Sequence, residues 1–105
     1  TYCGYEFNAD DPSKLASLYL DFMNRSEFAK TNAVKNKRVY FICLPNLLYG
    51  GASGIITEAY FAKWMQPNLT KEIDPLEIHK EFLNLQGVNL DLTKYGVFVY
   101  PSLVK

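Results

Sequence analysis

The sequence predicts an α/β fold, in which a short parallel sheet is flanked by helices. Two β-rich apolar runs, at residues 2–7 and 39–43, are separated by a segment whose apolar residues recur at helical spacing. A second helical segment follows the second run, and this order favours a right-handed crossover between parallel strands. We expect residues 1–105 to form a single domain, with 88–105 as its C-terminal tail.

The first helix is expected to begin near residue 12 and to end at Asn24-Arg25-Ser26. Asp11 can cap its first amides, and Pro12 suits the first helical position. An apolar stripe should then face the core, formed by Leu15, Leu18, Tyr19 and Phe22. Asn36-Lys37 is predicted to be the turn before the next strand.

The run at 39–43 is continuously apolar, which is typical of a strand buried on both faces, and Pro45 ends it. The next helix is predicted at about 52–66 and ends before Pro67. Apolar residues lie on nearly every side of this helix. We therefore expect it to be buried on most sides or to face a second domain.

The last helix is predicted from its ends. Asp74 can cap its start, with Glu77 three residues later as in a capping box, and Gly87 closes it. The inner stripe is expected to consist of Ile78, Phe82 and Leu85. His79, the single histidine of the chain, lies beside that stripe and is expected to be solvated.

Composition indicates a folded globular chain, because 49% of the residues are apolar and 21% are charged. Eleven basic and eleven acidic residues cancel, and no basic helix or stripe is visible, which argues against nucleic-acid binding. No apolar run approaches the length of a membrane span. Cys3 and Cys43 form no C-x-x-C pair, so no metal cluster is predicted, and whether they pair with each other stays open.

Parallel strands send their C-terminal ends to one edge of the sheet, where open α/β sheets bind ligands. The loops concerned are 4–10 and 44–53. They predict a rim of aromatic faces and hydrogen-bonding tips, formed by Tyr5, Phe7, Asn46, Tyr49 and Ser53. The alternative, that Tyr5 and Phe7 merely cover the end of the sheet, stays open.

The glycine loop at 50–54 is a second candidate. Its spacing, Gly-Gly-x-x-Gly, does not match the dinucleotide fingerprint, and no Lys-Ser/Thr follows as a Walker-type loop requires. A small enzyme or nucleotide-binding α/β domain that uses this loop is kept as the alternative function. No nucleophile and base are visible at working spacing, so we expect no catalytic residues, no cofactor, no metal and no enzyme activity.

Three stretches together resemble a known family: "NRSEFAKTNAVKNKRVYFI", then after a Gly/Ser loop "AYFAKWMQPNLTKEIDPLEIHKEFL", and finally "GVFVYP". The chain is similar over nearly all its length to the C-terminal lobe of substrate-binding proteins of ABC importers, in the class where a rigid helix joins two lobes. That class serves the uptake of iron–siderophore complexes, haem and cobalamin. The family often has glycine where this chain has Lys37.

The resemblance implies that the chain is a fragment, the distal part of one lobe. The N-terminal lobe, the linking helix, the secretion signal, any lipid-bearing cysteine and the acidic residues that dock onto the permease would lie upstream. Location would be extracytoplasmic, and membrane association would come only through that missing region. The resemblance further implies a solute-binding component that captures a ferric siderophore, haem or cobalamin and delivers it to the permease.

The resemblance puts the loop after "RVYFI" in the cleft between the lobes. Tyr49, with Asn46 and Ser53 beside it, would then stack on and hydrogen-bond the ligand, and Tyr5 and Phe7 would join them from the neighbouring strand end. Anionic ferric siderophores usually meet arginines, and this chain has only Arg25 and Arg38. Either the missing part supplies the charge or the ligand is less anionic.

Overall fold

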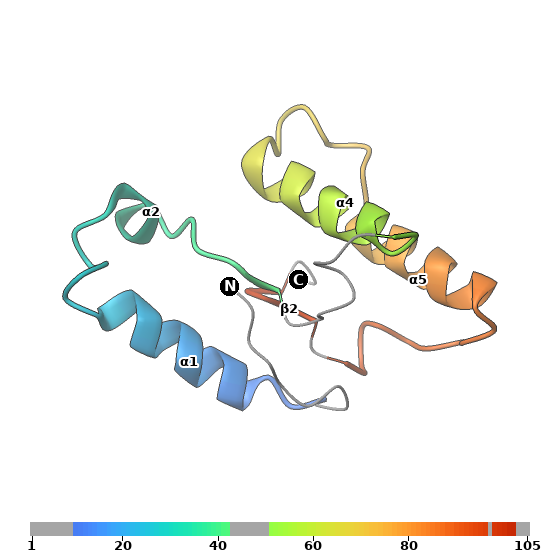
Figure 1. The fold of residues 1–105 in the computed structure, drawn as a ribbon, viewed down its shortest axis with the longest axis horizontal. Helices are drawn as coiled ribbons and strands as arrows, with labels where there is room; N and C mark the ends of the chain where they lie inside the picture. Colours follow the sequence, from blue (N-terminus) through green and yellow to red (C-terminus); the bar gives the residue numbers. More distant parts are fainter. Residues whose placement is uncertain (1–9, 43–50, 97, 103–105) are drawn as a thin grey trace. The chain divides into compact units, whose positions relative to one another are not determined.

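The computed structural model describes residues 10–42, 51–96 and 98–102 (Figure 1). Its elements are α1 (Ser13–Asn24), α2 (Asn32–Lys35), β1 (Phe41–Ile42), α4 (Gly54–Met65), α5 (Pro75–Leu85) and β2 (Val99–Tyr100). No helix among the described residues is long and apolar enough to cross a membrane. The chain divides into two compact units: a strand unit, Thr1–Leu44 with Gly96–Lys105, and a two-helix unit, Pro45–Tyr95. That 1–105 act as a single domain stays a prediction.

The strand unit contains the sheet of the described residues, a single pair of short strands. β1 and β2 run antiparallel, with Phe41 opposite Tyr100 and Ile42 opposite Val99. The mixed helix-and-strand class is therefore confirmed, but the pairing seen here is antiparallel rather than parallel. The predicted parallel partner, residues 2–7, lies outside the described residues. The apolar composition of a run such as 39–43 predicts that the strand is buried, but it does not predict which distant segment pairs with it.

Aromatic rings form the core of the strand unit. Leu15 and Phe41 are buried, and four partly buried side chains pack around them: Tyr19, Phe22, Val39 and Tyr100. The ring of Tyr19 meets Phe41 at 5.7 Å and Tyr100 at 5.2 Å between centroids, both edge to face. α1 therefore packs against the strands through three members of its predicted stripe, Leu15, Tyr19 and Phe22, whereas the fourth, Leu18, is 36% exposed. The aromatic surplus of the sequence fills this core.

The start of α1 is capped as expected, with a shift of one residue. The carboxylate of Asp11 accepts hydrogen bonds from the amide of Ser13 at 2.9 Å and from its hydroxyl at 2.8 Å. These bonds hold the pKa of Asp11 below its usual value. The helix ends at Asn24, and the predicted end at Asn24-Arg25-Ser26 is confirmed.

The turn after α2 has a left-handed residue at its centre. Lys37 has φ 54°, while its amide donates to Val34 at 3.0 Å and the amide of Arg38 donates to Ala33 at 2.7 Å. These two bonds make a Schellman motif, in which the residue after the helix cap takes the left-handed conformation. Glycine is the residue that adopts this conformation without steric cost, so Lys37 is strained there.

The end of α5 uses the same motif with the favoured residue. Gly87 has φ 77°, its amide donates to Asn84 at 3.0 Å, and the amide of Val88 donates to Leu83 at 2.9 Å. Gly87 therefore closes the helix as predicted. The two turns form a matched pair that differs in the residue at the left-handed position.

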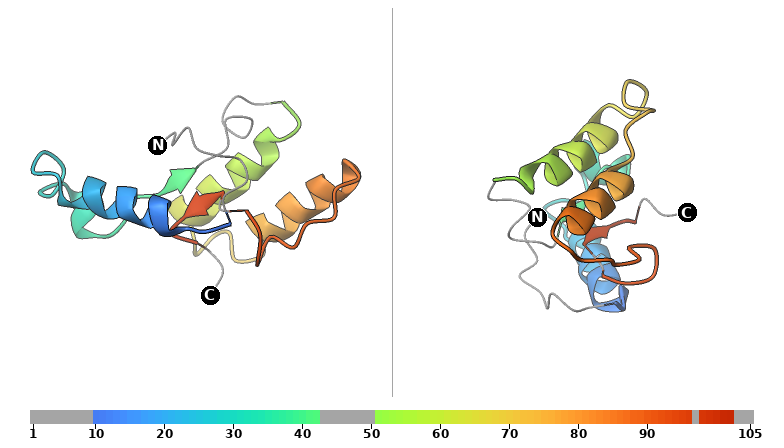
Figure 2. Two further views of the ribbon diagram at one scale, coloured as in Figure 1. Left: turned by 90° about the horizontal axis from the view of Figure 1, so that it is seen from below. Right: turned by 90° about the vertical axis from the view of Figure 1, so that its right-hand side faces the viewer.

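The two-helix unit is built by α4 and α5, which pack side by side (Figures 1 and 2). α4 buries one broad side, with Ile56, Thr57, Ala59, Tyr60 and Trp64. We expected α4 to be buried on most sides, and this is only partly right. Three of its apolar side chains, Ile55, Phe61 and Met65, are 41–63% exposed. Part of the apolar surface of α4 thus faces solvent.

The loop after α4 is tied back to the end of the helix. The ammonium group of Lys63 donates to the carbonyls of Thr70 at 3.0 Å and Lys71 at 3.2 Å. The hydroxyl of Thr70 donates to the carbonyl of Gln66 at 2.8 Å. Carbonyls at a helix end lack partners within the helix, and Thr70 supplies one where Pro67 prevents the helix from continuing. Lys63 binds carbonyls of the loop itself.

Substitutions at the two left-handed positions, Lys37 and Gly87, should change the free energy of unfolding in opposite directions. Lys37→Gly should raise the free energy of unfolding by about 0.5–1 kcal/mol, because it relieves the strained backbone. Gly87→Ala should lower it by about 1 kcal/mol, since an added Cβ at Gly87 meets no atom within 4 Å and the whole cost is conformational. Urea denaturation measures both. Two changes of the same sign would contradict this account of the turns.

Candidate functional site

The structure describes one of the five predicted rim residues, Ser53. It is half-buried and lies directly before α4, with a helical backbone (φ −75°, ψ −11°) and a side chain that does not cap the helix. Tyr5, Phe7, Asn46 and Tyr49 lie outside the described residues. That the five converge on one rim therefore stays a prediction.

The described part of the glycine loop, residues 51–54, is closed by its own hydrogen bonds. The amide of Gly54 donates to the carbonyl of Gly51 at 3.1 Å, and the amide of Ile56 donates to that of Ser53 at 3.1 Å. A helix N-terminus holds a phosphate through amides that have no partner of their own. Because two amides here already bond to the loop, the geometry favours a compact turn over a phosphate cradle.

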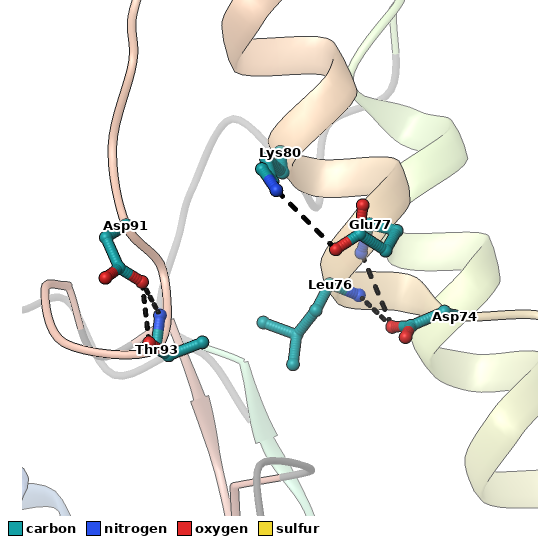
Figure 3. A network of polar contacts seen from close by, with 6 residues as sticks. All are labelled: Asp74, Leu76, Glu77, Lys80, Asp91 and Thr93. Atoms are coloured by element: carbon teal, nitrogen blue, oxygen red, sulfur yellow. Dashed lines mark hydrogen bonds and ion pairs between the residues drawn. The ribbon is translucent and has the colours of Figure 1, made fainter.

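An open groove of about 560 Å³ is lined by residues of α5 and by the residues before it. Figure 3 shows the polar contacts of Asp74, Leu76, Glu77 and Lys80 at the start of this helix. Asp74 accepts from the amides of Leu76 at 2.9 Å and Glu77 at 3.4 Å, which confirms its predicted role as the helix cap. The carboxylate of Glu77 lies 3.8 Å from the ammonium group of Lys80. Asp74 therefore acts as the cap of α5, and Glu77 pairs with a lysine one turn later in the same helix. An exposed ion pair such as Glu77–Lys80 contributes little to stability.

The chain after α5 is also held by a carboxylate. Asp91 accepts from the hydroxyl of Thr93 at 2.6 Å and from its amide at 3.1 Å (Figure 3), and it lies 3.2 Å from Lys94. Hydrogen bonds from Thr93 and Lys94 lower the pKa of Asp91. The predicted C-terminal tail, 88–105, thus contains an ordered turn.

His79 is buried, contrary to the expectation that solvent surrounds it. Only 2% of it is exposed, and burial lowers its pKa to about 4, because the charged imidazolium loses its hydration there. The predicted inner stripe of α5 is confirmed only in part: Ile78 and Phe82 are half-buried, but Leu85 is 78% exposed. The deepest burial falls instead on Pro75 and His79. Spacing carried a signal for this, because His79 follows Pro75 by four residues and shares its side of the helix.

Tyr60 on α4 is a second buried ionisable group, with 1% of its surface exposed. Burial, with a smaller contribution from the charge of Asp74, raises its pKa to about 12. Both Tyr60 and His79 are therefore uncharged and do not exchange protons near neutral pH. General acid–base catalysis is most effective when the pKa lies near the working pH, and burial moves both pKa values away from it.

The stability of the chain should fall on acidification because of His79. Its pKa in the folded state, about 4, lies below the ordinary value of 6.5, so the stabilising contribution is complete above pH 6.5. That contribution is lost as the pH falls from 6.5 towards 4, where the unfolded chain binds a proton that the folded chain refuses. His79→Gln and His79→Phe should each reduce the slope of unfolding free energy against pH, by at most about 1.4 kcal/mol per pH unit. Urea titrations across this range measure the slope. A slope in both variants equal to that of the parent chain would contradict the assignment.

Among the described residues, no three His, Cys, Asp or Glu side chains come together as metal ligands. No protein-family model, no curated protein and no solved structure matches the chain. Its function is therefore inferred from its residues and from the family resemblance of the quoted stretches.

Proposed function

We propose that the chain is the distal part of the C-terminal lobe of a substrate-binding protein of an ABC importer. In this role the protein captures an iron complex (a ferric siderophore or haem) or cobalamin outside the cytoplasmic membrane and delivers it to the permease. It performs no covalent chemistry. Any lipid anchor of the protein belongs to a region upstream of this chain.

The observation that carries the proposal is the left-handed backbone of Lys37, with φ 54°. The family pattern often has glycine at this position, after the "KN" turn. Glycine is favoured where the backbone must be left-handed, and the Schellman hydrogen bonds around Lys37 require that conformation. The replacement of the family's glycine by Lys37 therefore falls at a position where the backbone conformation favours glycine.

The other quoted stretches fold in a way that is compatible with the proposal. "RVYFI" leads into β1, both of whose residues are buried. The "AKW" stretch lies in the last turns of α4 before Pro67, and "IDPLEIHKEFL" forms α5 together with its cap. These agreements concern local structure and support the family likeness rather than any particular ligand.

The proposed ligand contacts are Tyr49, Asn46 and Ser53, joined by Tyr5 and Phe7. Flat aromatic faces suit a macrocycle or a chelate, and the amide and hydroxyl groups orient it by hydrogen bonds. Ser53 sits at the point where the loop meets α4, so the helix fixes the position of its backbone. The alternative function, a nucleotide-binding domain or small enzyme that uses the loop at 50–54, gains no support from the hydrogen-bonded turn found at 51–54.

Calorimetric titration tests the proposal and separates it from the alternative. The protein expressed from its whole gene should bind a ferric siderophore, haem or cobalamin, and the 105-residue chain should bind the same ligand more weakly, because the family holds its ligand between two lobes. ATP and NAD serve as the competing probes. Tight binding of a nucleotide with no response to the iron complexes or cobalamin would replace the proposal by the alternative.

Tyr49→Ala should weaken ligand binding by the whole-gene protein by about 1–3 kcal/mol, if its ring is an anchor in the cleft. Tyr95→Ala is the matched control, because Tyr95 is a tyrosine with 50% of its surface exposed and belongs to no predicted contact. The same calorimetric titration measures both variants. Equal affinities for the two would move the site away from Tyr49.

A further inference from the structure

The segment from residue 24 to residue 38 is exposed along almost its whole length, with Val34 as the half-buried exception. It carries five cations, Arg25, Lys30, Lys35, Lys37 and Arg38, and the single carboxylate of Glu27. We call this stretch the basic segment. The whole chain has a net charge of zero, so the local excess of positive charge is hidden in its totals.

Most of these cations are not neutralised by the part of the chain that the structure describes. Arg25 pairs with Asp21 at 3.2 Å. Among the described residues, none forms an ion pair with Lys30, Lys35, Lys37 or Arg38. Four cations within nine residues therefore face solvent. Salt screens their interaction with charges farther away than a Debye length, about 8 Å at physiological salt.

The basic segment also presents an aromatic ring that is held in place. Phe28 is 37% exposed, and its other face stacks on Phe22 of α1 at 4.6 Å between centroids with 14° between the planes. Phe22 in turn packs edge to face on Phe41 at 5.9 Å. The exposed ring is thus anchored to the core of the strand unit and is presented next to the cations.

We propose that the basic segment binds the surface of an anionic lipid bilayer, with Lys30, Lys35, Lys37 and Arg38 at the headgroups and Phe28 at the interface. Clustered cations are attracted to anionic lipids, and an aromatic ring beside them suits the boundary between headgroups and acyl chains. This contact goes beyond ligand capture and does not depend on which ligand the protein carries. It would hold the strand unit of the protein against the membrane.

A bilayer fits this surface better than nucleic acid does. Base-edge recognition places a longer helix in the major groove, whereas α2 has four residues. Binding to a fluid anionic bilayer requires no complementary shape, and its strength depends on how many cations lie near the surface. The exposed Phe28 has a role at a bilayer interface and none in contacts with phosphates alone.

The test is binding of the 105-residue chain to lipid vesicles, measured by co-sedimentation. The chain should bind vesicles that contain about a quarter phosphatidylglycerol at low salt, bind pure phosphatidylcholine vesicles far more weakly, and be released near 0.5 M salt. The variant Lys30→Gln/Lys35→Gln/Arg38→Gln leaves the strained Lys37 turn unchanged. It should bind the anionic vesicles about a hundredfold more weakly, since each cation near the surface contributes about fivefold.

The matched control is Lys71→Gln/Lys80→Gln/Lys94→Gln, which removes the same charge from exposed positions of the two-helix unit and should retain most of the binding. The proposal is overturned if the chain ignores anionic vesicles, if both triple variants lose binding equally, or if a short DNA duplex is bound more tightly than the vesicles. Circular dichroism of both variants checks that they are folded. Because no ligand is present in these measurements, a failed ligand titration leaves this result intact.

Discussion

The strand unit depends on the edge-to-face packing of Tyr19 against Phe41 and Tyr100. A sheet with two residues in each strand cannot hold itself together in water, because it buries too little apolar surface and makes too few hydrogen bonds. Tyr19 contacts one ring from each strand, and so α1 holds the pair closed. The core continues through Phe22 to Phe28, so the exposed turn that carries the cations rests on the same cluster of rings.

The two-helix unit relies on a different principle, the burial of polar side chains in their uncharged forms. Tyr60 and His79 rank among its most deeply buried side chains. Each gives up hydration, and both therefore keep their neutral state over the whole physiological range. Such groups add volume and shape to a small core, at the expense of tolerance to acid for His79 and of tolerance to alkali for Tyr60. They also show why a titratable residue in a helix is no evidence for catalysis until its surroundings are known.

Local signals predicted more of this fold than long-range ones. The starts and ends of the helices followed from Asp11, Asp74, Pro67 and Gly87, because capping and helix termination are settled by a few neighbouring residues. The phase of α5 was predicted only in part. Ile78 is half-buried, but the more deeply buried His79 lies one residue, or about 100°, farther around the helix, and apolar spacing alone did not select a histidine. The antiparallel partner of β1 lies almost sixty residues away, where no periodicity reaches.

For the candidate site, the sequence supplied residue types and their order along the chain. Of the rim it predicted, Ser53 can be placed at the start of α4, whereas Tyr5, Phe7, Asn46 and Tyr49 fall outside the described residues. The basic segment was missed because its cations are spread over a short helix and two turns, so no helical or strand period collects them. The segment became visible from coordinates, because its cations are exposed and four of them form no ion pair with any described residue.

The ties at the end of α4 give the two-helix unit a mechanical property. α4 is a rod of twelve residues, about 18 Å long at the usual helical rise, with Ser53 at its beginning. Near its other end, the ammonium group of Lys63 donates to the carbonyls of Thr70 and Lys71. Lys71 lies three residues before Asp74, the cap of α5. A displacement of the first turn of α4 would therefore be transmitted through these hydrogen bonds to α5, because they restrain the loop between the two helices.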